Sequence, residues 1–282
     1  MPKPSSPPIS GQRSSGNPVL ERAALALREG RFAEAEQLAA RVLRGSRTDN
    51  AAVSILAHAL LAQNRGAEAI EPLEKAVRRV GDPSIETLLG AALGSAGQRE
   101  QAIEQLRRTA ARRPPFLAAF QELAGQLAKA GRGNEAITAI ESALALAPDA
   151  IQLRLDLARL HSQQNQRAEA RAILIKARED APGRSDILTE LARVLLLDGD
   201  YAAAADAYRH ALGHRPDDAM TRADLAACLL EMGERDRGEA NLRSAFRSAP
   251  QQMLGRAVHA LAASSHGRFF FRPSAAAKFL QG

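Results

Sequence analysis

The sequence predicts an all-α fold: a right-handed superhelical solenoid of seven helix-turn-helix units with a capping helix at its C-terminal end. Composition and periodicity carry this prediction. Hydrophobic residues make up 45% of the 282 residues, but aromatic residues only 4%, with no Trp, so Ala and Leu must build the core. Helix-forming residues dominate and β-branched residues are sparse. A small residue also recurs about every 34 positions, which is typical of a repeat protein.

The recurring small residue follows a turn containing Gly, Asn or Gln, and apolar residues at helical spacing come after it. A first helix before each turn carries a Leu followed by a small residue, except in the first copy, where only Ala23 of this pair is present. Each copy therefore predicts two helices that cross at small side chains. The recurring residues are Ala35, Ala69, Ala102, Ala136, Ala170, Ala204 and Gly238.

Prolines mark where the second helices end, because proline cannot continue the hydrogen-bond ladder. They occur at corresponding positions late in the chain, at Pro114, Pro148, Pro182, Pro216 and Pro250. Residues 251–263 then predict a helix that covers the apolar face of the last repeat. A short final helix is expected to start at Pro273 and Ser274.

These features predict three segments: a disordered arm over residues 1–16, seven repeats over 17–250, and a capping helix with a basic aromatic tail over 251–282. The arm is rich in Pro and Ser and lacks the apolar region of a secretory signal. No apolar run approaches the ~20 residues of a membrane-spanning helix.

The net charge of +6 lies entirely at the two ends of the chain. Neither residues 1–16 nor 251–282 contain an acid, and the repeats between them are balanced. A neutral body disfavours nucleic acid as the main ligand. The uncompensated charges are Lys3, Arg13, Arg256, Arg268, Arg272 and Lys278.

The pattern over residues 17–250 resembles the tetratricopeptide repeat (TPR), whose 34-residue helix pairs carry the same Leu, small-residue, turn, Ala and Pro positions. The first copy is degenerate and ends in Arg47 rather than Pro. Leu, Ile or Ala mostly replaces the usual aromatics, which indicates a bacterial version. The sixth copy matches best, at Leu191, Ala192, Tyr201, Ala204, Tyr208, Ala211 and Pro216.

The resemblance implies a concave groove lined by the first helices, which binds a protein or peptide segment. Lys129, Arg159 and Arg193 would make it mildly basic, suited to an extended or acidic peptide; ordinary solvated charges are the alternative. Leu20, Ala24, Ser54 and His58 occupy the region where some members clamp a C-terminal carboxylate, which disfavours a chaperone-tail adaptor. The groove positions carried over are His58, Gln121, Lys129, Gln152, Arg159, Gln163, Thr189 and Arg193.

The C-terminal segment Arg268, Phe269, Phe270, Phe271 and Arg272 is a second candidate contact. A basic aromatic tail suits a membrane surface, a nucleic acid or a partner. Alternatively, these phenylalanines and Phe279 fold back and close the core.

The sequence contains no phosphate-binding GxxxxGK[ST] motif and no recognisable catalytic arrangement. Gly90, Gly94 and Gly97 fall on repeat positions, which favours a packing role. His210 and His214, four residues apart near a helix end, lack an HExxH context and favour a helix-dipole role over metal binding. His161 is interpreted as structural, and Cys228 as a small buried residue. No cofactor or metal is expected.

The sequence therefore predicts a non-catalytic, cytoplasmic scaffold or adaptor that binds a protein segment. Two alternatives remain: a nucleic-acid or membrane-surface binder acting through its basic ends, and an accessory subunit of a separately encoded enzyme such as a transferase. Self-association also stays open, because the degenerate first copy leaves that end of the stack exposed.

Overall fold

The computed structural model describes residues 17–270 and 272–281, so the predicted arm over residues 1–16 lies outside the described residues. The described ranges contain sixteen α-helices and no β-strand, which confirms the all-α prediction. The helices are α1 (Pro18–Arg28), α2 (Phe32–Gly45), α3 (Asn50–Ala62), α4 (Gly66–Val80), α5 (Pro83–Ser95), α6 (Arg99–Ala110), α7 (Leu117–Lys129), α8 (Gly133–Leu146), α9 (Ile151–Gln163), α10 (Arg167–Asp180), α11 (Ser185–Leu197), α12 (Tyr201–His214), α13 (Ala219–Glu231), α14 (Arg235–Ser248), α15 (Pro250–Ala263) and α16 (Pro273–Gln281).

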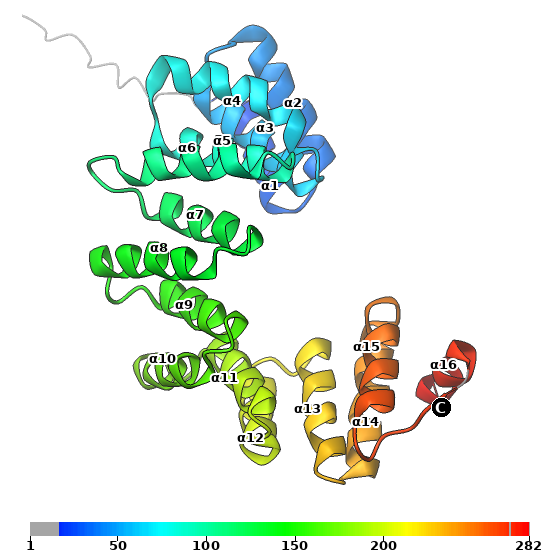
Figure 1. Cartoon of the computed structure of the whole chain (residues 1–282). Coiled ribbons are helices and arrows are strands. Elements are labelled where there is room, and N and C mark those ends of the chain that lie inside the picture. Colours follow the sequence, from blue (N-terminus) through cyan, green and yellow to red (C-terminus); the bar gives the residue numbers. More distant parts are fainter. Residues whose placement is uncertain (1–16, 271, 282) are drawn as a thin grey trace, which may run out of the picture. The chain divides into compact units, whose positions relative to one another are not determined.

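Along the chain, α1 to α14 follow one another as seven helix-turn-helix pairs, each with an odd-numbered first helix and an even-numbered second helix (Figure 1). The chain divides into two compact units between Arg132 and Gly133. Unit 1 contains α1 to α7, and unit 2 contains α8 to α16.

The turn inside every repeat has the same backbone conformation at one position. One residue with positive φ follows each first helix, and it is always Gly or Asn. These residue types adopt the left-handed conformation at the lowest cost, so the helix ends there and the chain reverses. The turn residues are Gly30, Asn64, Gly97, Gly131, Asn165, Gly199 and Gly233.

The recurring small residues are buried. The six alanines are at most 1% exposed. At Gly238, a Cβ atom would lie 2.8 Å from Cγ of Leu230 and 3.2 Å from the carbonyl oxygen of Ala226, so even Ala would be crowded. Cys228 is fully buried, as predicted.

Packing also explains two of the glycines that the sequence brings together in the third repeat. A Cβ atom at Gly90 would overlap the side chain of Leu106, and one at Gly94 would overlap that of Gln126. Gly97 occupies the left-handed turn position of its repeat. Helix packing and the turn therefore account for these glycines.

Two helices follow the seventh repeat. α15 packs against α13 and α14, and it buries Met253, Ala257 and Leu261. α16 contacts α14 and α15 and buries Ala276 and Leu280, of which Leu280 joins the same apolar cluster as Met253, Ala257 and Leu261. The apolar end of the seventh repeat is therefore covered.

Candidate functional site

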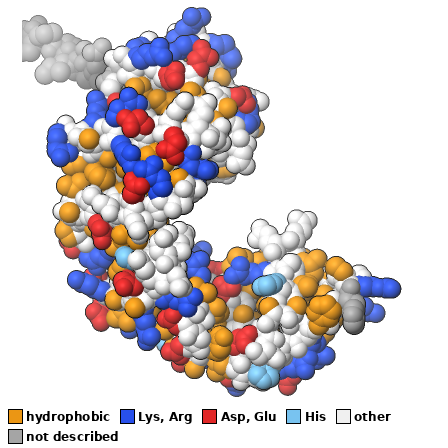
Figure 2. Space-filling model, viewed as in Figure 1, with side chains coloured by type: hydrophobic (Ala, Val, Ile, Leu, Met, Phe, Trp, Pro, Cys, Tyr) orange, Lys and Arg blue, Asp and Glu red, His pale blue; other side chains and the backbone are white. Residues whose placement is uncertain are grey.

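Charged side chains follow one another along the first helices of unit 2. Asp156 on α9, Glu190 on α11 and Asp224 on α13 occupy the same repeat position, and α11 contacts both neighbouring first helices. Arg159 and Arg193 each follow an acid by three residues, close to one helical turn. We call these five residues the first-helix row. Figure 2 shows acidic and basic side chains similarly interspersed on the face that it presents.

Glu190 lies at the centre of this row and binds two arginines. Nε of Arg159 donates to its Oε1 at 2.6 Å, across the boundary between α9 and α11, and Arg193 donates to its other oxygen. Arg159 also pairs with Asp156 at 3.3 Å. The Glu190 side chain is only 13% exposed, whereas that of Arg193 is 50% exposed. Arg193 therefore retains solvent-facing hydrogen-bond donors that a ligand can use.

Asp224 continues the row and is paired with Arg256 of α15, whose Nε donates to Oδ1 at 3.2 Å. Burial raises the pKa of Asp224, and the hydrogen bond from Arg256 only partly opposes this effect. The sequence predicts Arg256 to be an uncompensated C-terminal charge, whereas in the structure it forms an ion pair with Asp224.

The other predicted groove residues of unit 2 differ in availability. Gln152 is exposed and donates from Nε2 to Oδ1 of Asp156 at 3.2 Å, which joins it to the row. Gln163 is exposed at the end of α9. The Thr189 hydroxyl donates to the carbonyl oxygen of Ser185 at 2.9 Å, so this proton is already used within α11.

The three remaining groove residues belong to first helices of unit 1. His58 lies on α3, Gln121 is half-buried on α7, and Lys129 is exposed in the last turn of α7. His58 is solvent-accessible, yet the surrounding protein desolvates its ring and lowers its pKa. These three residues belong to unit 1, whereas the first-helix row belongs to unit 2.

The C-terminal tail is held against α14 by a buried carboxylate. Nε of Arg268 donates to Oε1 of Glu239 at 2.5 Å, and Nε of Arg235 donates to the same oxygen at 3.1 Å. The guanidinium of Arg243 lies 4.4 Å from the ring centroid of Phe279. Arg268 of the tail therefore forms an ion pair with α14 instead of remaining a free charge.

The phenylalanines of the tail differ in their burial. Phe270 packs with its ring centroid 5.3 Å from that of Phe279 and joins the apolar cluster under α16, whereas Phe269 is 72% exposed. Phe271 lies outside the described residues, and Arg272 is exposed. Phe270 and Phe279 therefore fold back onto the core, as one of the two predictions stated, whereas Phe269 remains at the surface.

A family model described as "Tetratricopeptide repeat" matches residues 26–92, 127–194 and 195–264. The chain belongs to the tetratricopeptide repeat family. TPR repeats generally mediate protein–protein interactions, and TPR proteins are typically non-catalytic scaffolds. A comparison with curated proteins found no significant match.

Solved TPR structures resemble this chain in fold. A TPR protein from Parabacteroides merdae is 14% identical, with a TM-score of 0.64 over 85% of this chain and 97% of its own. The thermophilic TPR protein TTC0263 of Thermus thermophilus is 25% identical, with a TM-score of 0.55 over 64% and 98%. A chain of the APC/C hetero-tetramer Cut9–Hcn1 is 17% identical, with a TM-score of 0.58; the match covers 97% of this chain but only 57% of that one.

Sequence reasoning identified the arginines of this TPR surface but missed their acidic partners. Asp156, Glu190 and Asp224 recur at the repeat spacing, three residues before Arg159, Arg193 and Ala227. That recurrence was the available signal. In the part of the chain that the structure describes, no helix is long and apolar enough to cross a bilayer. No group of three or more His, Cys, Asp or Glu there could hold a metal ion.

Proposed function

We propose that this TPR protein is a non-catalytic scaffold whose first-helix row binds an extended segment of a partner protein. The observation that carries the proposal is the recurrence of acid and arginine at the same position of consecutive first helices, α9 and α11, with Asp224 continuing the acids on α13. A surface that repeats with the helix spacing suits a ligand that also repeats, and an extended chain does.

The spacing gives the form of the ligand. Packed helices lie ~10 Å apart and an extended chain advances ~3.3 Å per residue, so about every third ligand residue meets a new first helix. The exposed guanidinium of Arg193 can take a ligand carboxylate in a bidentate pair. The acids of the row compensate its arginines, so the ligand needs an acidic residue opposite Arg193 rather than a uniformly acidic sequence.

We assign Gln152 and Gln163 to the same surface, as polar contacts on α9. The Thr189 hydroxyl oxygen would accept a hydrogen bond from the ligand, because its proton is already donated within α11. His58, Gln121 and Lys129 are proposed as the corresponding contacts in unit 1. Binding through the basic C-terminal end is less favoured, since Arg256 and Arg268 already pair with Asp224 and Glu239.

Affinity capture with mass spectrometry tests the proposal, using wild type, Arg193→Ala and Arg237→Ala. Arg237 is a matched control because it also pairs with an acid three residues earlier, Glu234, and its side chain is 74% exposed. A partner should be retained by wild type and R237A and lost from R193A. If R193A retains every partner that wild type captures, the first-helix row is not the binding surface.

A further inference from the structure

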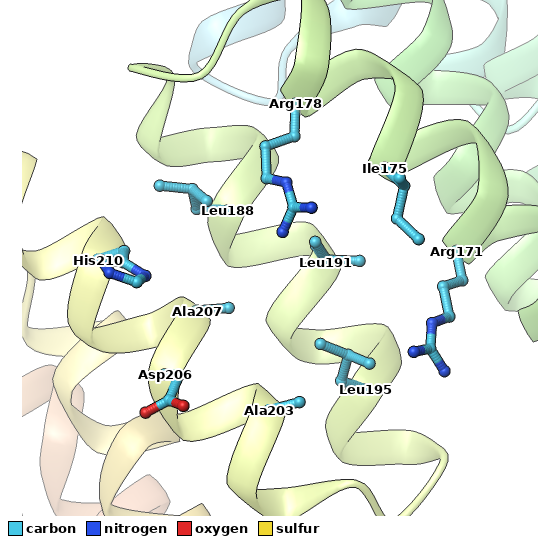
Figure 3. Close-up of a pocket in the computed structure, with 10 residues that line it drawn as sticks. All are labelled: Arg171, Ile175, Arg178, Leu188, Leu191, Leu195, Ala203, Asp206, Ala207 and His210. Carbon is cyan, nitrogen blue, oxygen red and sulfur yellow. The ribbon is translucent and has the colours of Figure 1, made fainter.

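A groove of about 320 Å³ crosses α11 between the second helices α10 and α12 (Figure 3). Leu188, Leu191 and Leu195 of α11 form its floor. Ile175 forms the α10 wall and lies between two arginines, Arg171 and Arg178 (Figure 3). The groove therefore combines an apolar floor with a basic edge.

The groove lies on the opposite side of α11 from the first-helix row. Successive helical residues are rotated by about 100°, so the three leucines fall within a sector of about 60°. Glu190 and Arg193 fall on the other side of the same helix. A ligand in the groove therefore need not contact the row.

Small side chains line part of the α12 wall. Ala203 and Ala207 face the groove, and Asp206 and His210 lie along the same wall (Figure 3). Asp206 is already paired with Arg209. The acid on this wall is thus compensated from outside the groove.

The two arginines of the α10 edge are not compensated by any described residue. Arg171 and Arg178 are exposed, and within residues 17–270 and 272–281 neither makes a hydrogen bond or an ion pair. This distinguishes them from Arg159 and Arg193, which share Glu190.

A corresponding groove of about 440 Å³ in unit 1 provides an internal comparison. It lies over Leu89 and Leu93 of α5, with Gln101 and Gln105 at the positions of Ala203 and Ala207. Each of its acidic residues has an arginine partner: Glu74 with Arg78, Glu100 with Arg132, and Glu104 with Arg108. The α10–α12 groove is the smaller of the two, and it differs in having alanines at these wall positions and arginines without an ion-pair partner among the described residues.

We propose that the α10–α12 groove is a second docking site, which binds an acidic amphipathic helix of a partner protein. Its volume is near the lower end of ligand pockets, ~300 Å³, and therefore admits a few apolar side chains rather than a whole cofactor. The partner's apolar face packs on the leucine floor, and its carboxylates pair with Arg171 and Arg178.

The arginine spacing gives the recognition pattern. Arg171 and Arg178 are seven residues apart on one helix, which places them ~10 Å apart along its axis. Acids at positions i and i+7 of a ligand helix have the same spacing, and apolar residues at i+3 and i+4 then point to the floor between them.

The chain itself shows that a short amphipathic helix fits against one of its second helices. α16 packs against α14 and buries Ala276 and Leu280. An arginine–carboxylate pair, Arg268 with Glu239, holds the segment before it. The proposed ligand combines apolar packing with an ion pair in the same way. In that complex, however, the carboxylates belong to the docked helix and the arginines belong to the groove.

The test uses a synthetic helical peptide of about 15 residues, long enough to form a helix, with Glu at i and i+7 and Leu at i+3 and i+4. A second peptide carries Lys in place of Glu. Binding to the full chain is measured by fluorescence anisotropy. The Glu peptide should bind, and Arg171→Glu/Arg178→Glu should weaken it by about tenfold or more. The Lys peptide should prefer that variant to wild type.

Two controls keep the result specific. Arg41→Glu/Arg44→Glu on α2 makes the same charge change at exposed arginines without a described partner and should alter binding by less than about twofold. Ala203→Trp fills the groove without changing charge and should abolish binding, with helicity checked by circular dichroism. Equal binding of both peptides, or equal weakening by the α2 variant, overturns the proposal. So does self-association of the chain that requires Arg171 and Arg178 and excludes the peptide, because the occupant is then a second copy.

Discussion

Replacing Glu239 by Gln tests whether a buried carboxylate anchors the C-terminal tail. The Glu239 side chain is 5% exposed and lies among three arginines: Arg235, Arg243 and Arg268. Burial alone would raise its pKa, but hydrogen bonds from Arg268 and Arg235 hold that pKa below its ordinary value. Gln preserves the shape and one acceptor oxygen but removes the charge.

The expected loss is about 1–2 kcal/mol. Hydrogen bonds to a charged group contribute ~1.5–3 kcal/mol each. This value must be reduced because the arginine side chains are 29–45% exposed and remain partly hydrated. Relief of the cost of burying a carboxylate offsets a further part. The remainder corresponds to roughly a five- to thirtyfold larger population in which the tail is detached.

Trypsin cleavage after Arg268 and Lys278, followed by mass spectrometry, reports on the tail locally. Cleavage of E239Q should be about tenfold faster than that of wild type at pH 7. Glu169→Gln is the control, because Glu169 is exposed on α10 and has no hydrogen bond or ion pair with another described residue. Equal cleavage of E239Q and wild type would refute the anchoring role.

Comparing E239Q with wild type also predicts how the free energy of unfolding should depend on pH. A carboxyl whose folded-state pKa is depressed contributes stability above its unfolded pKa and loses it as the pH falls through the folded value. Wild type should therefore lose the Glu239 contribution below its ordinary pKa of 4.5, whereas E239Q lacks it throughout. Their unfolding free energies, measured with urea, should converge at acidic pH.

Three further predictions concern burial and packing within each unit. Burial raises the pKa of the Cys228 thiol to about 12, so iodoacetamide should leave the native chain unmodified while alkylating the urea-unfolded chain; rapid alkylation of native protein would contradict this. Gly66→Ala should destabilise unit 1 by ~1–3 kcal/mol, because its methyl would lie 2.6 Å from Cβ of Ser95 and 3.1 Å from the carbonyl oxygen of Ala92. Gly125→Ala, with open space on α7, should stabilise it by ~0.5–1 kcal/mol in the same urea titration.

The repeat architecture could be predicted because its determinants lie close together in the sequence and recur. Ala at the helix crossing and Gly or Asn at the turn are both required by local geometry, and seven copies reinforce one another. The structure adds the reason why Asn64 and Asn165 can replace Gly, namely that both have positive φ.

The surface chemistry could not be predicted in the same way, because it depends on contacts between helices. Arg159 meets Glu190 31 residues later, and Arg268 meets Glu239 29 residues earlier. Neither pairing follows from helix periodicity within one element. Counting charges along the chain therefore assigned Arg268 to a free basic tail, although the structure pairs it internally.

If the first-helix row binds a ligand as proposed, its internal ion pairs should affect the specificity of binding more than the affinity. A ligand carboxylate that binds Arg193 competes with Glu190, so part of its interaction energy replaces an existing ion pair. An acid placed elsewhere on the ligand meets Asp156, Glu190 or Asp224 and is repelled. In the proposed function the row would therefore reject acidic segments with the wrong spacing, whereas Arg171 and Arg178 on the other side of α11, which have no ion-pair partner among the described residues, would attract a nearby acid. The two proposed sites thus divide recognition: the groove supplies electrostatic attraction, and the row discriminates by register.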